Sequence, residues 1–195
     1  KQIYETAKAP EIRVNPGEIT SAVEEIIKKT GDLKYAKENI RNIGLAIQAT
    51  GAQGKDIGEL MGEFQKMGII DPKQTLEVID TLVLQGKEGA FTLKELAALG
   101  PRVITAYTSK GRGGVQAIRE MGAALQMIRM GTGSSEMAAT AFENVMKTFT
   151  DNKKLKMLQA GGIQIFDPEA AKKGKEVIRP VHELMAEIIR KTKGK

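Results

Sequence analysis

The sequence predicts an all-α fold, a compact multi-helix bundle of about eight or nine short helices. Apolar residues recur every three or four positions along most of the chain, which is the spacing of one helix face. Side chains that favour helix starts stand before these stretches. Only the stretch 162–168, GIQIFDP, alternates as a strand does, and one strand cannot form a sheet. Together these observations favour an all-α fold over a β or α/β fold.

Four predicted helix starts carry a side chain that can cap the free amides of the first turn. They are Asn15–Pro16, Asp71–Pro72, Thr92–Glu95 and Asp167–Pro168. Proline suits the first helical position because its missing amide hydrogen would have no helical acceptor there. The Thr–x–x–Glu spacing allows a capping box, in which each side chain bonds the other residue's backbone amide. We expect Glu18 and Gln74 to reach back to Asn15 and Asp71 in the same way.

The apolar residues after these starts fall on single helix faces. The four clearest stripes are Ile19, Val23, Ile26 and Ile27; Ile57, Leu60, Met61 and Phe64; Leu76, Ile79, Leu82 and Val83; and Val177, Val181, Leu184, Met185 and Ile188. Aromatic residues make up only 4% of the chain, so we expect an aliphatic core. No apolar run approaches the ~18 residues of a membrane span, so no stable membrane insertion is expected.

A weak internal repeat predicts how the helices are grouped. Residues 40–48, IRNIGLAIQ, resemble residues 118–126, IREMGAALQ, and a glycine-rich corner and an amphipathic helix follow each. We therefore expect a core domain over residues 14–169, with similar halves at 14–90 and 91–169. Chance similarity between helices of biased composition is the alternative. An N-terminal extension (1–13) and a basic C-terminal helix (170–195) would flank the core. Since the sequence begins with lysine, we expect it to be part of a longer chain.

Two glycine-rich corners raise the question of a phosphate-binding loop. A Walker-type loop needs two glycines five residues apart, then lysine and a hydroxyl residue, after a strand. In TGAQGKD, Gly51 and Gly54 are too close, and Asp56 replaces the hydroxyl. RMGTGSSEMAATAF, residues 129–142, has no lysine. SKGRGG, residues 109–114, is basic and flexible in composition and could contact a phosphate only weakly.

A corner between two packed helices explains residues 129–142 better. Gly131 can end the first helix in the left-handed conformation, which glycine adopts cheaply. Thr132 or Ser134 can cap the second helix. Small and apolar residues then supply its buried face: Ala138, Ala139, Ala141, Phe142, Val145, Met146 and Phe149.

The sequence predicts no catalytic, cofactor-binding or metal-binding residues, and therefore no enzyme. The absence of cysteine excludes disulfides, thiolate metal sites and cysteine nucleophiles. The single histidine, His182, lies in a charged helical stretch and is expected to be solvated. The acid pairs Glu24–Glu25 and Glu59/Glu63 have the ordinary spacing of solvated helix faces.

The net charge of +6 is concentrated at the C-terminal end of the chain. Residues 151–195 contain eleven Lys and Arg against six Asp and Glu, a net +5. A basic segment can bind nucleic acid or an acidic partner, although a solvated helix face is the simpler explanation. If nucleic acid binds, the candidate contacts are Lys172, Lys173, Lys175, Arg179, Arg190, Lys191, Lys193 and Lys195.

The order of these segments resembles the core region of phage tail tape measure proteins over residues 14–169. The resemblance begins with VNPGEITSAVEEIIKKTGDL and continues with AIQATGAQGKDIGELMGEFQKMGI. It is strongest over residues 92–149, where a Leu-x-x-Leu helix leads to Gly100–Pro101, an alanine-rich helix and a glycine corner. It ends with LQAGGIQIFDPE. Each motif is common, but their order and spacing together are specific.

This resemblance implies a structural protein from a phage or prophage. Tape measure proteins scaffold polymerisation of the tail tube and set tail length, which needs no catalytic residue and no cofactor. The implied partners are tail assembly chaperones, tail tube and tail tip proteins, and further copies of the chain itself. The implied locations are the virion tail and, during assembly, the host cytoplasm. A basic helical nucleic-acid-binding module is the alternative function.

Overall fold

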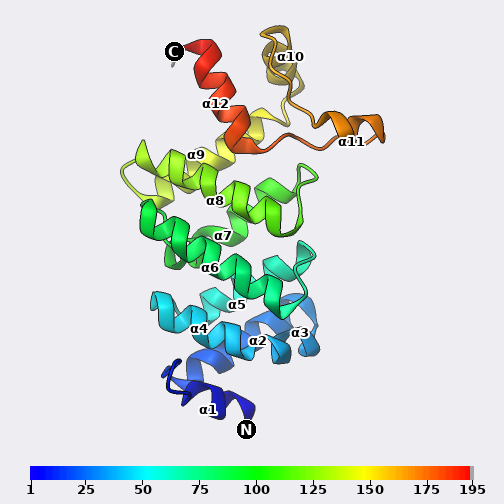
Figure 1. Cartoon of the computed structure of the whole chain (residues 1–195). Coiled ribbons are helices and arrows are strands. Elements are labelled where there is room, and N and C mark those ends of the chain that lie inside the picture. Colours follow the sequence, from blue (N-terminus) through cyan, green and yellow to red (C-terminus); the bar gives the residue numbers. More distant parts are fainter. Residues whose placement is uncertain (194–195) are drawn as a thin grey trace. The chain divides into compact units, whose positions relative to one another are not determined.

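The computed structural model describes residues 1–193, and this part of the chain forms twelve helices (Figure 1). They are α1 (Gln2–Ala7), α2 (Pro16–Thr30), α3 (Leu33–Glu38), α4 (Ile40–Thr50), α5 (Gly54–Lys66), α6 (Pro72–Glu88), α7 (Leu93–Thr108), α8 (Gly114–Met130), α9 (Ser135–Thr148), α10 (Asn152–Ala160), α11 (Pro168–Lys172) and α12 (Val181–Thr192). The all-α prediction is confirmed. The helices outnumber the prediction because α1, α3 and α11 have only five or six residues, too few to show a helical period.

The chain divides into two compact units, Lys1–Pro101 and Arg102–Lys195. The boundary lies inside α7, further along the chain than the boundary that the repeat predicts after residue 90. The first half of α7 belongs with unit 1 because Gly100 packs against Leu60 of α5. Residues 1–13, expected to be an extension, are part of the same unit, and Ile12 is fully buried in it.

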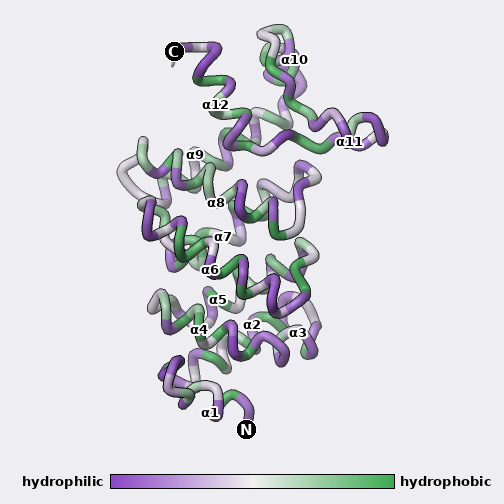
Figure 2. Tube along the Cα trace, in the orientation of Figure 1, coloured by the Kyte–Doolittle hydropathy of each residue, from purple (hydrophilic) through white to green (hydrophobic). Residues whose placement is uncertain are grey.

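In unit 1, α2 and α5 pack against each other at very short range. Gly54 and Gly58, one turn apart on α5, face the backbone of Glu18 and Ala22 on α2. A Cβ atom added at Gly54 would lie 1.9 Å from the carbonyl oxygen of Glu18. Figure 2 shows hydrophobic and hydrophilic residues alternating along these helices, as amphipathic packing requires. The close packing of α2 against α5 therefore requires glycine at these two positions of α5.

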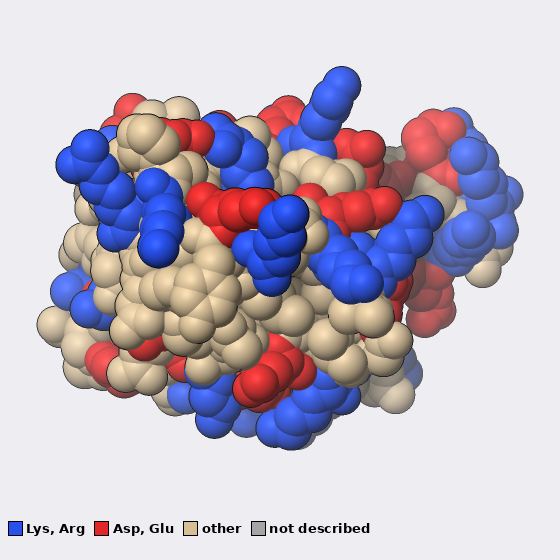
Figure 3. Space-filling view, turned by 90° about the horizontal axis from the view of Figure 1, so that it is seen from below, with Lys and Arg blue, Asp and Glu red and all other residues tan. Residues whose placement is uncertain are grey.

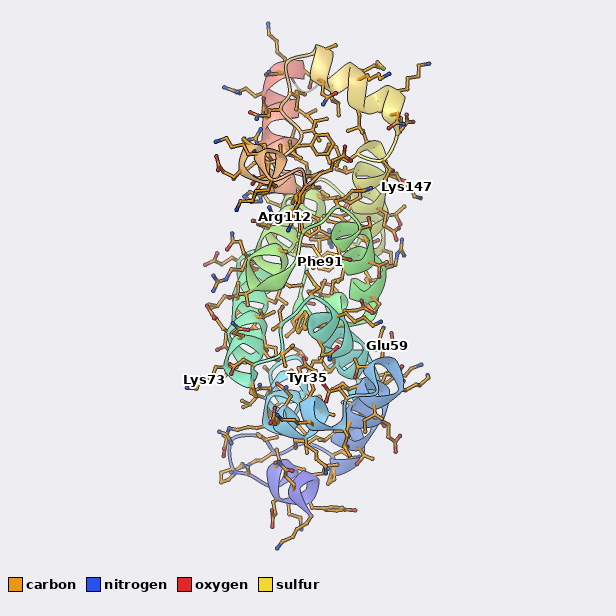
Figure 4. All side chains as sticks on the ribbon, turned by 90° about the vertical axis from the view of Figure 1, so that its right-hand side faces the viewer. Tyr35, Glu59, Lys73, Phe91, Arg112 and Lys147 are labelled. Atoms are coloured by element: carbon orange, nitrogen blue, oxygen red, sulfur yellow. The ribbon has the colours of Figure 1, made fainter. Side chains whose placement is uncertain are left out.

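The core of unit 1 is aliphatic with a few aromatic side chains, as the composition predicts. The fully buried side chains of this unit include Ile12, Ile19, Ile26, Tyr35, Ile43, Ile57, Leu60, Met61, Phe64 and Ile69. The hydroxyl of Tyr35 donates to the carbonyl oxygen of Met61 at 3.1 Å, which satisfies the one polar atom of this buried ring. Figure 4 shows Tyr35 and Phe91 among the packed helices, and Glu59 and Lys73 at the outside.

The predicted N-caps are confirmed at all four helix starts. The side chains of Asn15, Asp71 and Asp167 accept hydrogen bonds from first-turn amides. Thr92 and Glu95 form the full capping box, with the Thr92 amide donating to Glu95 at 2.6 Å and the Glu95 amide donating to Thr92 at 3.2 Å.

The prediction for Glu18 is wrong. Its carboxylate accepts a hydrogen bond from the Gly54 amide of α5 at 2.5 Å instead of bonding the start of its own helix. The close approach of α2 and α5 brings the free amide of a second helix start within reach of this carboxylate.

In unit 2, α8 lies beside α9 and α12 (Figure 1). The second half of α7 joins them through Tyr107, whose ring meets Phe142 of α9 edge to face at a centroid distance of 6.0 Å. The alternating stretch GIQIFDP forms only an isolated antiparallel bridge, between Phe166 and Ile178. Two backbone hydrogen bonds of 2.8 Å flank it, from Asp167 to Val177 and from Arg179 to Ile165.

The predicted C-terminal helix of residues 170–195 begins at Val181 in the structure. Gly174 turns the chain with a φ of +70°, and residues 176–179 then run extended beside the bridge. This pairing supplies backbone hydrogen bonds that a helix would otherwise provide. Residues 194 and 195 lie outside the described part of the chain. Within residues 1–193, each helix is too short or too polar to span a bilayer.

Candidate protein-interaction surface

The first glycine-rich corner, TGAQGKD, joins α4 to α5. Gly51 ends α4 in the left-handed conformation with a φ of +64°, and its amide bonds the carbonyl of Ile47. The amide of Gly54, at the start of α5, is bound to the carboxylate of Glu18. A phosphate would need such an amide and would be repelled by this carboxylate. The geometry is that of a helix corner.

The second corner joins α8 to α9, as predicted. Ser134 caps α9 by accepting from the Met137 amide at 3.2 Å. The prediction that Gly131 adopts the left-handed conformation is wrong, since its φ is −99°. The last turn of α8 instead tightens, with bonds of 3.0 Å from Gly131 to Ile128 and 3.2 Å from Thr132 to Arg129. This tightening satisfies the end of α8 without a left-handed residue.

The basic stretch SKGRGG contains a side chain that the fold uses internally. The guanidinium of Arg112 makes a bidentate ion pair with Glu120 of α8, which is 3% exposed, and its Nε donates at 3.0 Å. The Tyr107 hydroxyl donates to the same carboxylate at 2.8 Å. Figure 4 shows Arg112 directed towards the interior of the bundle. This cluster ties α7 and the loop to α8, and Arg112 is not available for a phosphate.

The pKa values of this cluster follow from its burial and pairing. Burial raises the pKa of Tyr107, and the adjacent Glu120 charge raises it further. Burial lowers the pKa of Arg112, but the hydrogen bond and charge of Glu120 outweigh it and keep the pKa above its usual value. Tyr107 and Arg112 therefore hold their protons throughout the physiological range, which is typical of a structural network.

The paired acids and the histidine do not converge on one site. Glu25 pairs with Lys28, and the buried carboxylate of Glu63 pairs with Lys29 at 3.0 Å. His182 is half-buried rather than solvated, and its Nδ1 has no hydrogen-bond partner. No group of three potential metal-ligating side chains occurs among residues 1–193. The absence of catalytic activity stays a prediction.

Several of the predicted nucleic-acid contacts at the C-terminal end are paired within the chain. Lys172 bonds Glu169 at 2.6 Å, and Arg179 bonds Glu187 at 2.7 Å. Lys191 also pairs with Glu187 and with backbone carbonyls of residues 161 and 162. The hydrogen bond with Arg179 lowers the pKa of Glu187. Lys173, Lys175, Arg190 and Lys193 are exposed and form no ion pair among the described residues, and Lys195 lies outside them.

Acidic and basic side chains are mixed on other surfaces too. Figure 3 shows them interspersed over the face of the molecule that it presents, around a broad uncharged area. Mixed charge of this kind gives no strong single-sign field on that face.

An open groove of about 470 Å³ lies between α7 and α9 in unit 2. Ala106 and the buried Met146 contribute apolar surface to it. Arg102 and Glu143 line it as a closed ion pair, with an Nη2–Oε2 distance of 2.5 Å. Their hydrogen bond raises the pKa of Arg102 and lowers that of Glu143.

Lys110 and Lys147 also line this groove. They form no ion pair among the described residues. Lys147 is exposed and points outward in Figure 4, and Lys110 is half-buried. The groove thus combines apolar surface with an excess of positive charge, because Arg102, Lys110 and Lys147 line it together with one acid, Glu143.

The family profile of phage-related minor tail proteins matches residues 2–195. The chain belongs to the phage-related minor tail protein family. This minor tail protein is also similar to a probable tape measure protein of Burkholderia phage BcepMu, with 28% identity over 146 residues. These findings confirm the resemblance to tape measure proteins and give the chain a structural role in a phage tail.

The aligned region covers 73% of this minor tail protein and 17% of the BcepMu relative. The chain therefore spans a small part of the length of that relative. No solved structure matches the chain.

Sequence reasoning did not identify the groove of this minor tail protein. Lys110 and Lys147 are far apart in the sequence, and each follows an unremarkable helical pattern. Only the packing of α7 against α9, through Tyr107 and Phe142, brings the two lysines to one surface. Lys110 has no acidic residue three or four positions away, which was the one signal that the sequence offered, whereas Lys147 follows Glu143 by four residues.

Proposed function

We propose that this chain is a folded assembly domain of a tape measure protein, which scaffolds polymerisation of the tail tube and sets tail length. The observation that carries the proposal is the similarity to a probable tape measure protein over 73% of the chain. The longest helices of the described part of this chain, α6 and α8, have 17 residues each, which is ~26 Å at ~1.5 Å per residue. The domain would act through folded surfaces rather than as one continuous helical rod.

In this proposal the domain binds other proteins and catalyses no reaction. Its partners would be tail assembly chaperones, tail tube proteins and tail tip proteins. The domain would bind them first in the host cytoplasm and then in the virion tail. The groove between α7 and α9 supports this view, since it offers apolar surface beside an excess of positive charge. Hydrolysis of peptidoglycan by the purified chain would contradict it.

Tail length in the parent phage or prophage tests the proposal. Residues 14–169 would be deleted in frame, and tails would be measured by electron microscopy. If the segment lies extended and helical in the tail, the tails shorten by roughly 230 Å at ~1.5 Å per residue. A smaller shortening indicates that the helices stay packed in the tail. Loss of all tails indicates an assembly domain that acts before length is measured.

A matched control keeps the chain length but removes the fold. Residues 14–169 would be replaced by an unrelated helical segment of equal length. Tails of normal length that are not infectious would indicate that tail length depends on the number of residues. They would also indicate that assembly of an infectious tail depends on the folded surface. Normal, infectious tails after the simple deletion would refute the proposal.

A nucleic-acid-binding module is the second candidate, and α10 is the observation that favours it. Lys153, Lys154 and Lys156 are exposed on this helix and form no ion pair among the described residues. Binding of a labelled DNA duplex should weaken steeply with salt, because each phosphate contact releases counterions. Glutamate at all three lysines should reduce the log–log salt slope by as much as ~2.7. No binding at low salt would exclude this function.

A further inference from the structure

Two helices at one end of unit 2 have little cover from the rest of the unit. α10 has no buried residue, and α12 extends beyond Val181 and Leu184, which are its buried residues. In Figure 1, both helices project from the end of unit 2 that carries the C-terminus. The Lys191 side chain donates to the carbonyl oxygens of Gly161 and Gly162, directly after α10, and so ties the two helices together. We call this surface the α10–α12 end.

An exposed apolar side chain stands beside lysines on each of these helices. Met157 of α10 is 67% exposed, and the exposed Lys153 and Lys154 stand four and three residues before it. Ile189 of α12 is 53% exposed, and the exposed Lys193 stands four residues after it. Side chains three or four residues apart share one helix face. Each apolar side chain therefore faces solvent together with its lysines.

Positive charge is in excess over the two helices. The acids of α12, Glu183 and Glu187, are both paired with Arg179. Asp151 is the one acid at α10, and its side chain caps that helix. Five exposed cations of the α10–α12 end form no ion pair among the described residues: Lys153, Lys154, Lys156, Arg190 and Lys193. A partner that matches this surface must combine negative charge with an apolar phase.

We propose that the α10–α12 end binds the surface of a membrane that contains anionic lipids. Met157 and Ile189 would enter the boundary between head groups and acyl chains, and the cations would stay at the level of the lipid phosphates. α10 has 9 residues and α12 has 12, fewer than the ~20 that cross a bilayer, so the helices would lie on the surface. A nucleic acid offers phosphates to the cations but no apolar phase to Met157 and Ile189.

Sedimentation of the full chain with lipid vesicles tests this contact. The chain should bind vesicles of phosphatidylcholine and phosphatidylglycerol in equal amounts, and vesicles of phosphatidylcholine alone should bind it at least tenfold more weakly. Added salt should weaken binding to the mixed vesicles, because it screens the exposed charges. Lys153→Gln, Lys154→Gln and Lys156→Gln together should weaken that binding roughly a hundredfold, because each lysine contributes to the attraction.

A second variant separates the apolar contribution from the charge. Met157→Ser with Ile189→Ser keeps the net charge and should weaken binding to the mixed vesicles about tenfold, because less apolar surface enters the membrane. The matched control for the lysine variant removes the same charge at exposed positions of unit 1: Lys37→Gln, Lys55→Gln and Lys73→Gln. This control should bind as the unsubstituted chain does. All these side chains are exposed, so circular dichroism should show an unchanged helix content in every variant.

The outcomes decide the proposal in both directions. Weaker vesicle binding by the lysine variant and by the serine variant, with an unaffected control, would support it. No binding to the mixed vesicles at low salt would overturn it, and so would equal losses in the lysine variant and its control. Unchanged vesicle binding by the serine variant would also overturn it, because charge alone would then explain the attraction, as it would for a nucleic acid. Tail length does not enter this test, so the membrane contact can fail while the proposed function stands.

Discussion

Replacing Gly58 with alanine is expected to force α2 and α5 apart. The new Cβ would lie 2.4 Å from the carbonyl oxygen of Ala22 and 2.8 Å from its Cα, whereas ordinary contacts begin at 3.4 Å. Both neighbours are backbone atoms, so no side-chain rotation relieves the contact. The helices must separate by about 1 Å, which weakens the dispersion contacts of the residues packed around this site.

The size of the effect follows from two opposing contributions. Overpacking a core costs about 1–3 kcal/mol, and contact of backbone with backbone places this site at the upper end. Alanine regains ~1 kcal/mol of helix propensity over glycine. The net loss of unfolding free energy is about 2 kcal/mol, which lowers the melting temperature of a unit of about 100 residues by roughly 10 °C.

Thermal unfolding followed by circular dichroism measures this loss, and Gly62→Ala is the matched control. Gly62 lies on the same helix, but its added Cβ would meet only the flexible side chain of Lys29, at 2.9 Å from Cδ. This variant should melt within a few degrees of the unsubstituted chain. If Gly58→Ala leaves the melting temperature unchanged, or if both variants lose the same stability, the close approach of α2 and α5 is not what requires glycine.

Three further predictions concern named polar contacts. Glu120→Gln leaves the Arg112 charge without its carboxylate and should cost about 3 kcal/mol by urea unfolding; a loss below ~1 kcal/mol would contradict a buried ion pair. Thr92→Ala removes a capping box and should cost ~1 kcal/mol in the same assay, so unchanged stability would exclude this role. Burial raises the pKa of Tyr35 to about 12, from 10.0 in its ordinary state, so stability should fall as pH rises from about 10 to 12. Tyr35→Phe should abolish that part of the decline, and an equally steep decline in the variant would contradict it.

Local chemistry predicted the helix starts well. Asn15, Asp71 and Asp167 cap their helices because a cap needs only a side chain and the amides that follow within three residues. Glu18 had the same local signal and was mispredicted. The approach of α5 offered its carboxylate a better donor, and that approach is a tertiary feature that the sequence around Glu18 does not contain.

Features that depend on distant contacts could not be predicted from the sequence. The sequence around Arg112 indicates a free cation in a glycine-rich stretch. In the structure, Glu120 of α8 lies beside this guanidinium and pairs with it. Gly131 could end α8 by either of two geometries, and the tightened last turn was the one formed. The groove is the clearest case, because its walls come from separate helices and its charge depends on which lysines lack a partner.

The proline inside α7 affects how that helix would exchange its amide hydrogens with solvent. Pro101 has no amide hydrogen, and its ring excludes the usual bond to the carbonyl of Ala97. The ladder of hydrogen bonds along α7 is therefore interrupted at the boundary between the two compact units. In a hydrogen-exchange experiment, Leu93–Gly100 and the residues after Pro101 should behave as separate blocks, each protected by the stability of its own unit.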